Sequence, residues 1–123
     1  MKIGLDVHGV INKHIKFFSL LSSYFIANDH EVHIITGMKK SEYDKTYSDK
    51  YMPYTHFYSI TDDLLTKIAY INDIHDRPRF SEYNWNIAKG VYCKKNKIDI
   101  MLDDSDIYDK YFSTSYFQIR KKK

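Results

Sequence analysis

The chain has 123 residues, a formal net charge of +3 at pH 7 and a hydrophobic content of 43%. This length suits one domain with one core, and a composition with only two Pro and four Gly excludes a disordered chain. Residues 120–123 are all basic, so we expect a near-neutral domain at residues 1–119 and a basic C-terminal tail at 120–123. The charge therefore gives no indication of a nucleic-acid groove, although nucleic acid is not excluded as a partner.

The single cysteine and the apolar runs restrict the remaining classes. Cys93 is the one cysteine of the sequence, which excludes an internal disulfide and a cysteine-rich zinc site. Its helical surroundings predict a buried side chain. Asp6 interrupts the first apolar run, so no secretory leader is expected. The longest apolar stretch, residues 15–27, is too short to span a membrane. We expect a cytoplasmic protein, and the richness in Tyr, Phe, Lys, Ile and Asn suggests a phage or viral origin.

Apolar runs and helical periodicity alternate along the chain. The runs at 2–7, 31–37, 55–60 and 97–105 predict buried parallel strands, and 116–119 predicts a closing edge strand. Helical spacing is found at 16–28, at Tyr43, Tyr47 and Tyr51, at 61–73 and at 81–96, with Ser81 and Thr61 or Asp62 as expected N-caps. Residues 75–80 are expected to form a loop. This order predicts a Rossmann-like α/β domain, with one mostly parallel sheet and helices on both faces.

Polar side chains follow the predicted strands at the positions where ligands bind in such a sheet. They are Asp6 and His8, Thr36 and Gly37, and Asp103 and Asp104. In a doubly wound sheet these carboxyl ends lie at one rim, where ligands collect. Three carboxylates with a hydroxyl and a turn glycine suit Mg²⁺ and an anion. An anionic nucleophile meeting an anionic phosphate also needs positive charge between them.

These residues resemble the ordered motifs of the haloacid dehalogenase-like (HAD) phosphohydrolase superfamily. The likeness rests on Asp6 in "GLDVHGVI", Thr36 in "HIITG", Lys89 in the helix before the last motif, and Asp103–Asp104 in "IMLDDSD". It spans residues 2–105 and is similar to the small phage-type and nucleotidase-like members. It implies a HAD core with a minimal cap or none, and a Mg²⁺-dependent phosphatase working through an aspartyl-phosphate.

The resemblance also implies a role for each residue. Asp6 is the expected nucleophile, and His8, Thr36 and Lys89 complete the catalytic set. The substrate is expected to contact Gly9, Thr36, Gly37 and Lys89. The Mg²⁺ is expected at Asp6, Asp103 and Asp104, with help from the backbone around His8.

His8 departs from the pattern of the superfamily, whose phosphatases mostly carry a second Asp there. We interpret His8 as the general acid and base, because an imidazole transfers protons near neutral pH. The alternative is that His8 only packs in the turn, which would leave a weakened enzyme.

Simpler interpretations stand beside each role. Asp6 and Asp104 could be turn or cap acids, Thr36 a helix N-cap, and Lys89 a solvated lysine, with Lys94, Lys95 or Lys97 as the motif lysine instead. His14, His30, His33, His56 and His75 show no paired metal-ligand spacing, and His33, inside a predicted strand, is expected to be a core or sheet-face residue. A zinc site joining His8 and His14 remains an alternative.

The expected substrate is a small phosphorylated molecule, with a nucleotide as the first candidate. Two other functions stay open: a weakened HAD-fold protein that binds phosphate or a partner, and a 3′-phosphatase on nucleic-acid ends. Without a cap the site is open, so either the substrate is large or a second copy covers it. No membrane partner is expected.

Overall fold

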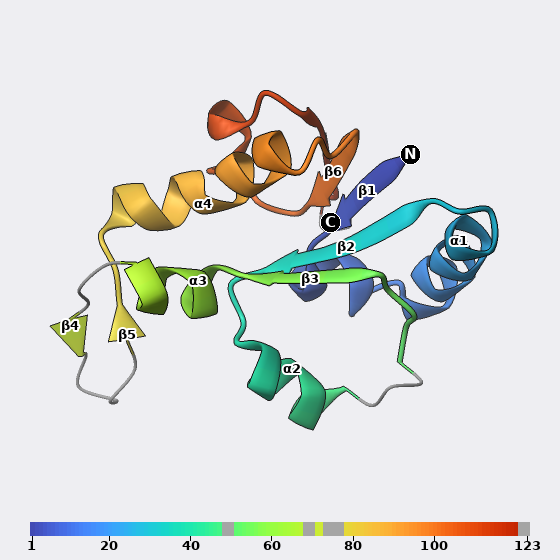
Figure 1. Cartoon of the computed structure of the whole chain (residues 1–123), viewed down its shortest axis with the longest axis horizontal. Helices are drawn as coiled ribbons and strands as arrows, with labels where there is room; N and C mark the ends of the chain where they lie inside the picture. Colours follow the sequence, from blue (N-terminus) through green and yellow to red (C-terminus); the bar gives the residue numbers. More distant parts are fainter. Residues whose placement is uncertain (48–50, 68–70, 73–77, 121–123) are drawn as a thin grey trace.

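The computed structural model describes residues 1–47, 51–67, 71–72 and 78–120. Its main sheet has five parallel strands in the order β3-β2-β1-β6-β7 (Figure 1). The strands are β1 (Lys2–Leu5), β2 (Glu31–Thr36), β3 (His56–Ser59), β6 (Ile100–Asp103) and β7 (Ser115–Gln118). The predicted fold class, an α/β domain with a parallel sheet, is confirmed. The strand order reverses at β1, which is the position where such sheets bind ligands.

Helices cover both faces of the sheet, as predicted. The side chains of β2 alternate: Val32 and Ile34 pack with Phe18 of α1 (Ile15–Ala27) and with Tyr43 of α2 (Lys40–Thr46), whereas Ile35 packs on the other face with Cys93 of α4 (Glu82–Lys95). The alternation follows from the period of two along a strand. Burial raises the pKa of the Cys93 thiol to about 12, so this cysteine is a core residue, as expected.

Two helix starts show how capping residues set the boundaries. Ser81 caps α4 as predicted, because its hydroxyl accepts a hydrogen bond from the Asn84 N–H at 3.2 Å. The prediction that Thr61 or Asp62 caps the previous helix is wrong. α3 (Ile60–Lys67) begins earlier, and the Ser59 hydroxyl accepts from the Asp62 N–H at 3.1 Å.

The segment after α3 differs from the predicted helix 61–73. The helix ends at Lys67, and β4 (Ile71–Asn72) pairs antiparallel with β5 (Pro78–Arg79). Pro78 and Arg79 were expected in a loop, and residues 68–70 and 73–77, with His75, lie outside the described residues. Ile71 is β-branched, and such a residue is found in strands as well as on helix faces. Its helical spacing from Leu64 therefore does not distinguish a helix from a strand at this position.

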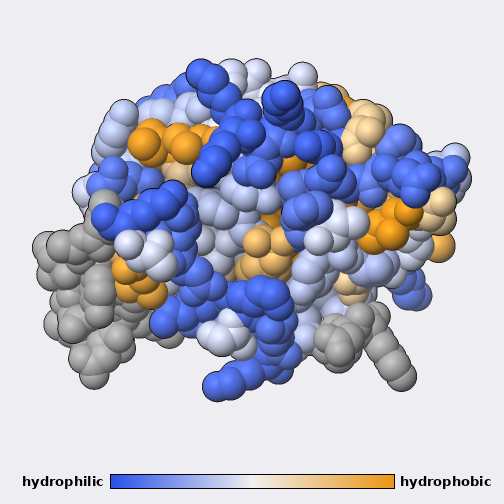
Figure 2. Space-filling view, viewed as in Figure 1, coloured by the Kyte–Doolittle hydropathy of each residue, from blue (hydrophilic) through white to orange (hydrophobic). Residues whose placement is uncertain are grey.

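Three further features complete the domain. The helix expected to carry Tyr43, Tyr47 and Tyr51 ends at Thr46. The Tyr47 ring stacks on that of Tyr51, with centroids 4.3 Å apart, and is tilted by 46° against that of Tyr43, with centroids 5.0 Å apart. A 3₁₀ turn, η2 (Asp109–Tyr111), stands between β6 and β7. In Figure 2 most of the visible surface is hydrophilic, with hydrophobic residues in separate patches. Of the helices in the described ranges, none is long and apolar enough to cross a bilayer.

Candidate functional site

The turn after β1 places Asp6 at the carboxyl end of the sheet. The Asp6 N–H donates to the Leu102 carbonyl at 3.0 Å, which joins this turn to β6. The next residues form η1 (Val7–Ile11), a π-type turn interrupted at His8 and Gly9. Gly9 has φ +78°, and a Cβ there would lie 2.1 Å from Oδ2 of Asp104. Only glycine therefore lets the β1 turn pack against the loop that follows β6.

Lys89 points from α4 into this rim of the sheet. Its ammonium lies 3.1 Å from Oδ1 of Asp6 and 2.7 Å from Oδ2 of Asp103, and the residue is only 3% exposed. The interpretation as a solvated lysine is therefore wrong. Lys94, Lys95 and Lys97, the other candidates, are all exposed.

Asp103 and Asp104 differ in how much of each carboxylate is free. Asp103 is fully buried, and its two oxygens accept from Lys89 and from the Ser105 N–H at 3.0 Å. Asp104 is only partly buried. One oxygen each from Asp6, Asp103 and Asp104 lie within 4.8 Å of one another, so the proximity expected from the strand ends is observed.

The negative charges of the three carboxylates are not balanced by the one ammonium beside them. Three carboxylates face one ammonium, which leaves two negative charges when all groups are ionised. Burial raises the pKa of Asp6 to about 7; Lys89 opposes this shift and Asp103 adds to it. Burial and the Asp103 carboxylate also raise the pKa of Asp104. A divalent cation would relieve this repulsion, and an all-carboxylate donor set fits Mg²⁺.

A cavity of about 380 Å³ opens above these carboxylates. His8, Thr36, Gly37 and Lys89 line it together with the acidic cluster, whereas Gly9 does not line it and instead lies against Asp104. Thr36 is not a helix N-cap, since that position of α2 belongs to Lys39. The Thr36 hydroxyl accepts from the Met38 N–H at 3.2 Å, within the turn after β2.

Sequence reasoning missed the aromatic wall of the cavity. The Trp85 indole N–H donates to the Tyr108 hydroxyl at 3.0 Å, and Lys89 lies 5.3 Å from the centre of the Tyr108 ring. A Cβ on Gly37 would lie 2.7 Å from the Trp85 ring, so the glycine makes room for the indole. Neither aromatic residue follows a strand, and Trp85 had been predicted only as part of a helix face. The other lining residues not foreseen are Met38, Glu42, Ile60 and Ser105.

The histidines are placed in different parts of the molecule. His8 is exposed at the mouth of the cavity, and His14 is exposed at the start of α1. In the described part of the chain, two groups of three or more side chains could hold a metal: Asp6 with Asp103 and Asp104, and Glu31 with His33 and His56. The alternative zinc site at His8 and His14 matches neither group.

No family model, no curated protein and no solved structure matches the chain. The resemblance to the HAD superfamily therefore stays a prediction, and the case for a function depends on the geometry of the site.

Proposed function

We propose that the protein is a Mg²⁺-dependent phosphomonoesterase that acts through an aspartyl-phosphate on Asp6. The main support is the position of Asp6 beside Lys89, Asp103 and Asp104 at the base of one cavity. Asp6, Asp103 and Asp104 would hold the ion, which when bound offsets negative charge on the phosphoryl group. Asp103 is already engaged by Lys89 and Ser105, so Asp6 and Asp104 have the freer oxygens.

In the first step, an Asp6 oxygen attacks the phosphorus, and the bond from phosphorus to the leaving oxygen breaks. Lys89 contacts this carboxylate and offsets the charge that gathers as the two anions meet. The Thr36 hydroxyl is positioned to donate a hydrogen bond to a phosphoryl oxygen, since it lines the same cavity. The leaving oxygen takes a proton from His8.

In the second step, water attacks the phosphorus and the bond to Asp6 breaks. His8 accepts the proton of the water, which frees inorganic phosphate and restores the carboxylate. His8 suits this role because it is exposed at the mouth of the cavity, where both the leaving group and water arrive. The Trp85 and Tyr108 rings give the cavity flat apolar walls, which favours a nucleotide or another aromatic phosphate ester as the substrate.

The direct test is release of phosphate from p-nitrophenyl phosphate. We expect activity with Mg²⁺, loss of that activity when EDTA removes the ion, and full recovery when Mg²⁺ is added back. Activity that is the same with and without EDTA would contradict the proposal. A panel of nucleoside monophosphates then tests the substrate class.

We expect His8→Ala to lower kcat by about 10²- to 10⁴-fold, because it removes the group that transfers the proton. His8→Asp should keep more activity than His8→Ala, since a carboxyl group can also carry the proton. His14→Ala, at another exposed histidine, is the control and should leave kcat unchanged. If His8→Ala is as active as the parent protein, His8 has no role in proton transfer.

A further inference from the structure

A second group of metal-ligating side chains lies at the opposite rim of the sheet from Asp6. Glu31 is the first residue of β2, His56 is the first residue of β3, and His33 is the residue of β2 that pairs with His56. One ligand atom from each side chain lies within 4.8 Å of the other two. The proposed phosphatase site lies at Asp6, which follows the end of β1. Glu31, His33 and His56 lie at or near the starts of strands and are not part of that site.

We propose that Glu31, His33 and His56 form a binding site for a Zn²⁺-type ion that holds the starts of β2 and β3 together. The donors are Nε2 of His33, Oε1 of Glu31 and a ring nitrogen of His56, with water in the fourth position. Imidazole and carboxylate are the donors that Zn²⁺ takes in proteins. This site is independent of the proposed phosphatase activity.

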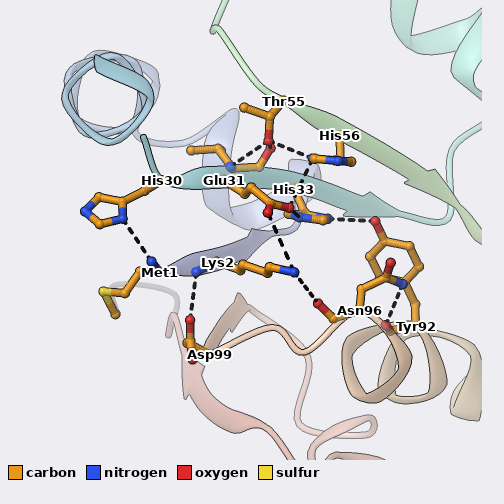
Figure 3. Close-up of polar contacts among 11 residues, drawn as sticks. Met1, Lys2, His30, Glu31, His33, Thr55, His56, Tyr92, Asn96 and Asp99 are labelled. Atoms are coloured by element: carbon orange, nitrogen blue, oxygen red, sulfur yellow. Dashed lines mark hydrogen bonds and ion pairs between the residues drawn. The ribbon is translucent and has the colours of Figure 1, made fainter. Parts of the chain in front are cut away.

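His33 is already oriented as a ligand would be. It is 1% exposed, its Nδ1 lies 2.7 Å from the Tyr92 hydroxyl, and its Nε2 lies 2.8 Å from Oε1 of Glu31 (Figure 3). A hydrogen bond from the second ring nitrogen commonly fixes the tautomer of a metal-bound histidine. When Nδ1–H of His33 donates to Tyr92, the Nε2 lone pair faces Oε1 of Glu31. A cation bound between Nε2 and Oε1 takes the place of the proton that otherwise joins these two atoms.

His56 is the ligand that has to move. Its ring stacks on that of His33, with centroids 4.2 Å apart and planes 6° from parallel, so the two rings do not converge on one point. The His56 side chain is 50% exposed and is held at Nδ1 by the Thr55 hydroxyl at 2.8 Å. Its Nδ1 lies 3.5 Å from Oε1 of Glu31, and one ligand atom from each of the three side chains lies within 4.8 Å of the other two. A turn of this exposed ring brings a His56 nitrogen to the separation of about 3.3 Å from the other donors that tetrahedral bonds of about 2.0 Å require.

Lys2 both supports and limits the site. Its ammonium lies 3.6 Å from Oε2 of Glu31 and donates to the Asn96 carbonyl at 3.3 Å (Figure 3). This contact leaves Oε1 turned toward the histidines, but the positive charge opposes a bound cation. We therefore expect moderate affinity for Zn²⁺, and tighter binding in Lys2→Met.

The test is a calorimetric Zn²⁺ titration of metal-free protein carrying Asp104→Asn, so that the acidic cluster competes less. One ion should bind, and Zn²⁺ should raise the Tm, because it binds only the folded chain. Removing a ligand, by His56→Ala or Glu31→Gln, should weaken binding by about a hundredfold or more, and Tyr92→Phe by about tenfold. His14→Ala, at an exposed histidine outside the cluster, is the matched control and should bind as the parent does.

Equal Zn²⁺ affinity in His56→Ala and His14→Ala would overturn the site. Unfolding of every variant in EDTA is measured first, so that lost binding is separated from lost folding. Because neither binding nor Tm depends on phosphate release, this result and that of the phosphatase assay can fail separately.

Discussion

Asp6→Asn is expected to abolish Mg²⁺-dependent phosphate release, with a fall in kcat of at least about 10⁴-fold. Loss of a covalent nucleophile has effects of this size, because the other groups of the site cannot act in its place. The substitution keeps the shape of the side chain and leaves Lys89 paired with Asp103 at 2.7 Å. Initial rates of phosphate release at saturating Mg²⁺ measure the effect, with the exposed Asp106→Asn as the control.

The same variant separates a chemical role for Asp6 from a structural one. The pKa of Asp6 is raised to about 7 from an ordinary value of 3.8, so the folded protein holds this proton more tightly than the unfolded chain. The free energy of unfolding therefore falls as pH rises through this range. Because Asn does not ionise, Asp6→Asn removes this pH-dependent loss of stability. We expect the Tm of Asp6→Asn at pH 8 without metal to equal or exceed that of the parent. Full activity in Asp6→Asn would refute the covalent mechanism.

The strands could be predicted because each is a short apolar run that ends in a polar residue. The parallel sheet followed from helical segments between those runs. The hairpin of β4 and β5 could not be predicted, because four residues in two short strands carry no periodicity of their own. The start of α3 was missed because its cap, Ser59, is also the last residue of a strand.

The acidic cluster was predictable because parallel strands bring their carboxyl ends to one rim. Lys89 could be identified only through the family resemblance, since Lys94, Lys95 and Lys97 share its sequence surroundings and only the packing of α4 separates them. His33 and His56 show the limit of spacing arguments. They lie 23 positions apart and meet only because β2 and β3 pair in this register, which no local pattern encodes.

Lys89→Met is expected to lower both activity and stability, and to make stability strongly dependent on pH. Burial lowers the pKa of Lys89, but Asp6 and Asp103 outweigh it and raise the pKa, so the side chain is charged. Without this ammonium the two buried carboxylates repel each other, and breaking such a buried pair costs about 3–5 kcal/mol.

The pH dependence identifies the cause of that loss. In Lys89→Met the pKa of Asp6 rises further above that of the unfolded chain, because the ammonium that opposed the shift is gone, so the folded state is favoured when this carboxyl is protonated. Urea unfolding should therefore show a smaller loss of stability at pH 5 than at pH 8.

Lys94→Met, at an exposed lysine of the same helix, should change little at either pH. Adding Asp103→Asn to Lys89→Met should recover part of the stability at pH 8, because it removes one of the two unpaired charges. An equal loss at both pH values would mean that packing of the Lys89 stem, rather than its charge, stabilises this rim of the sheet.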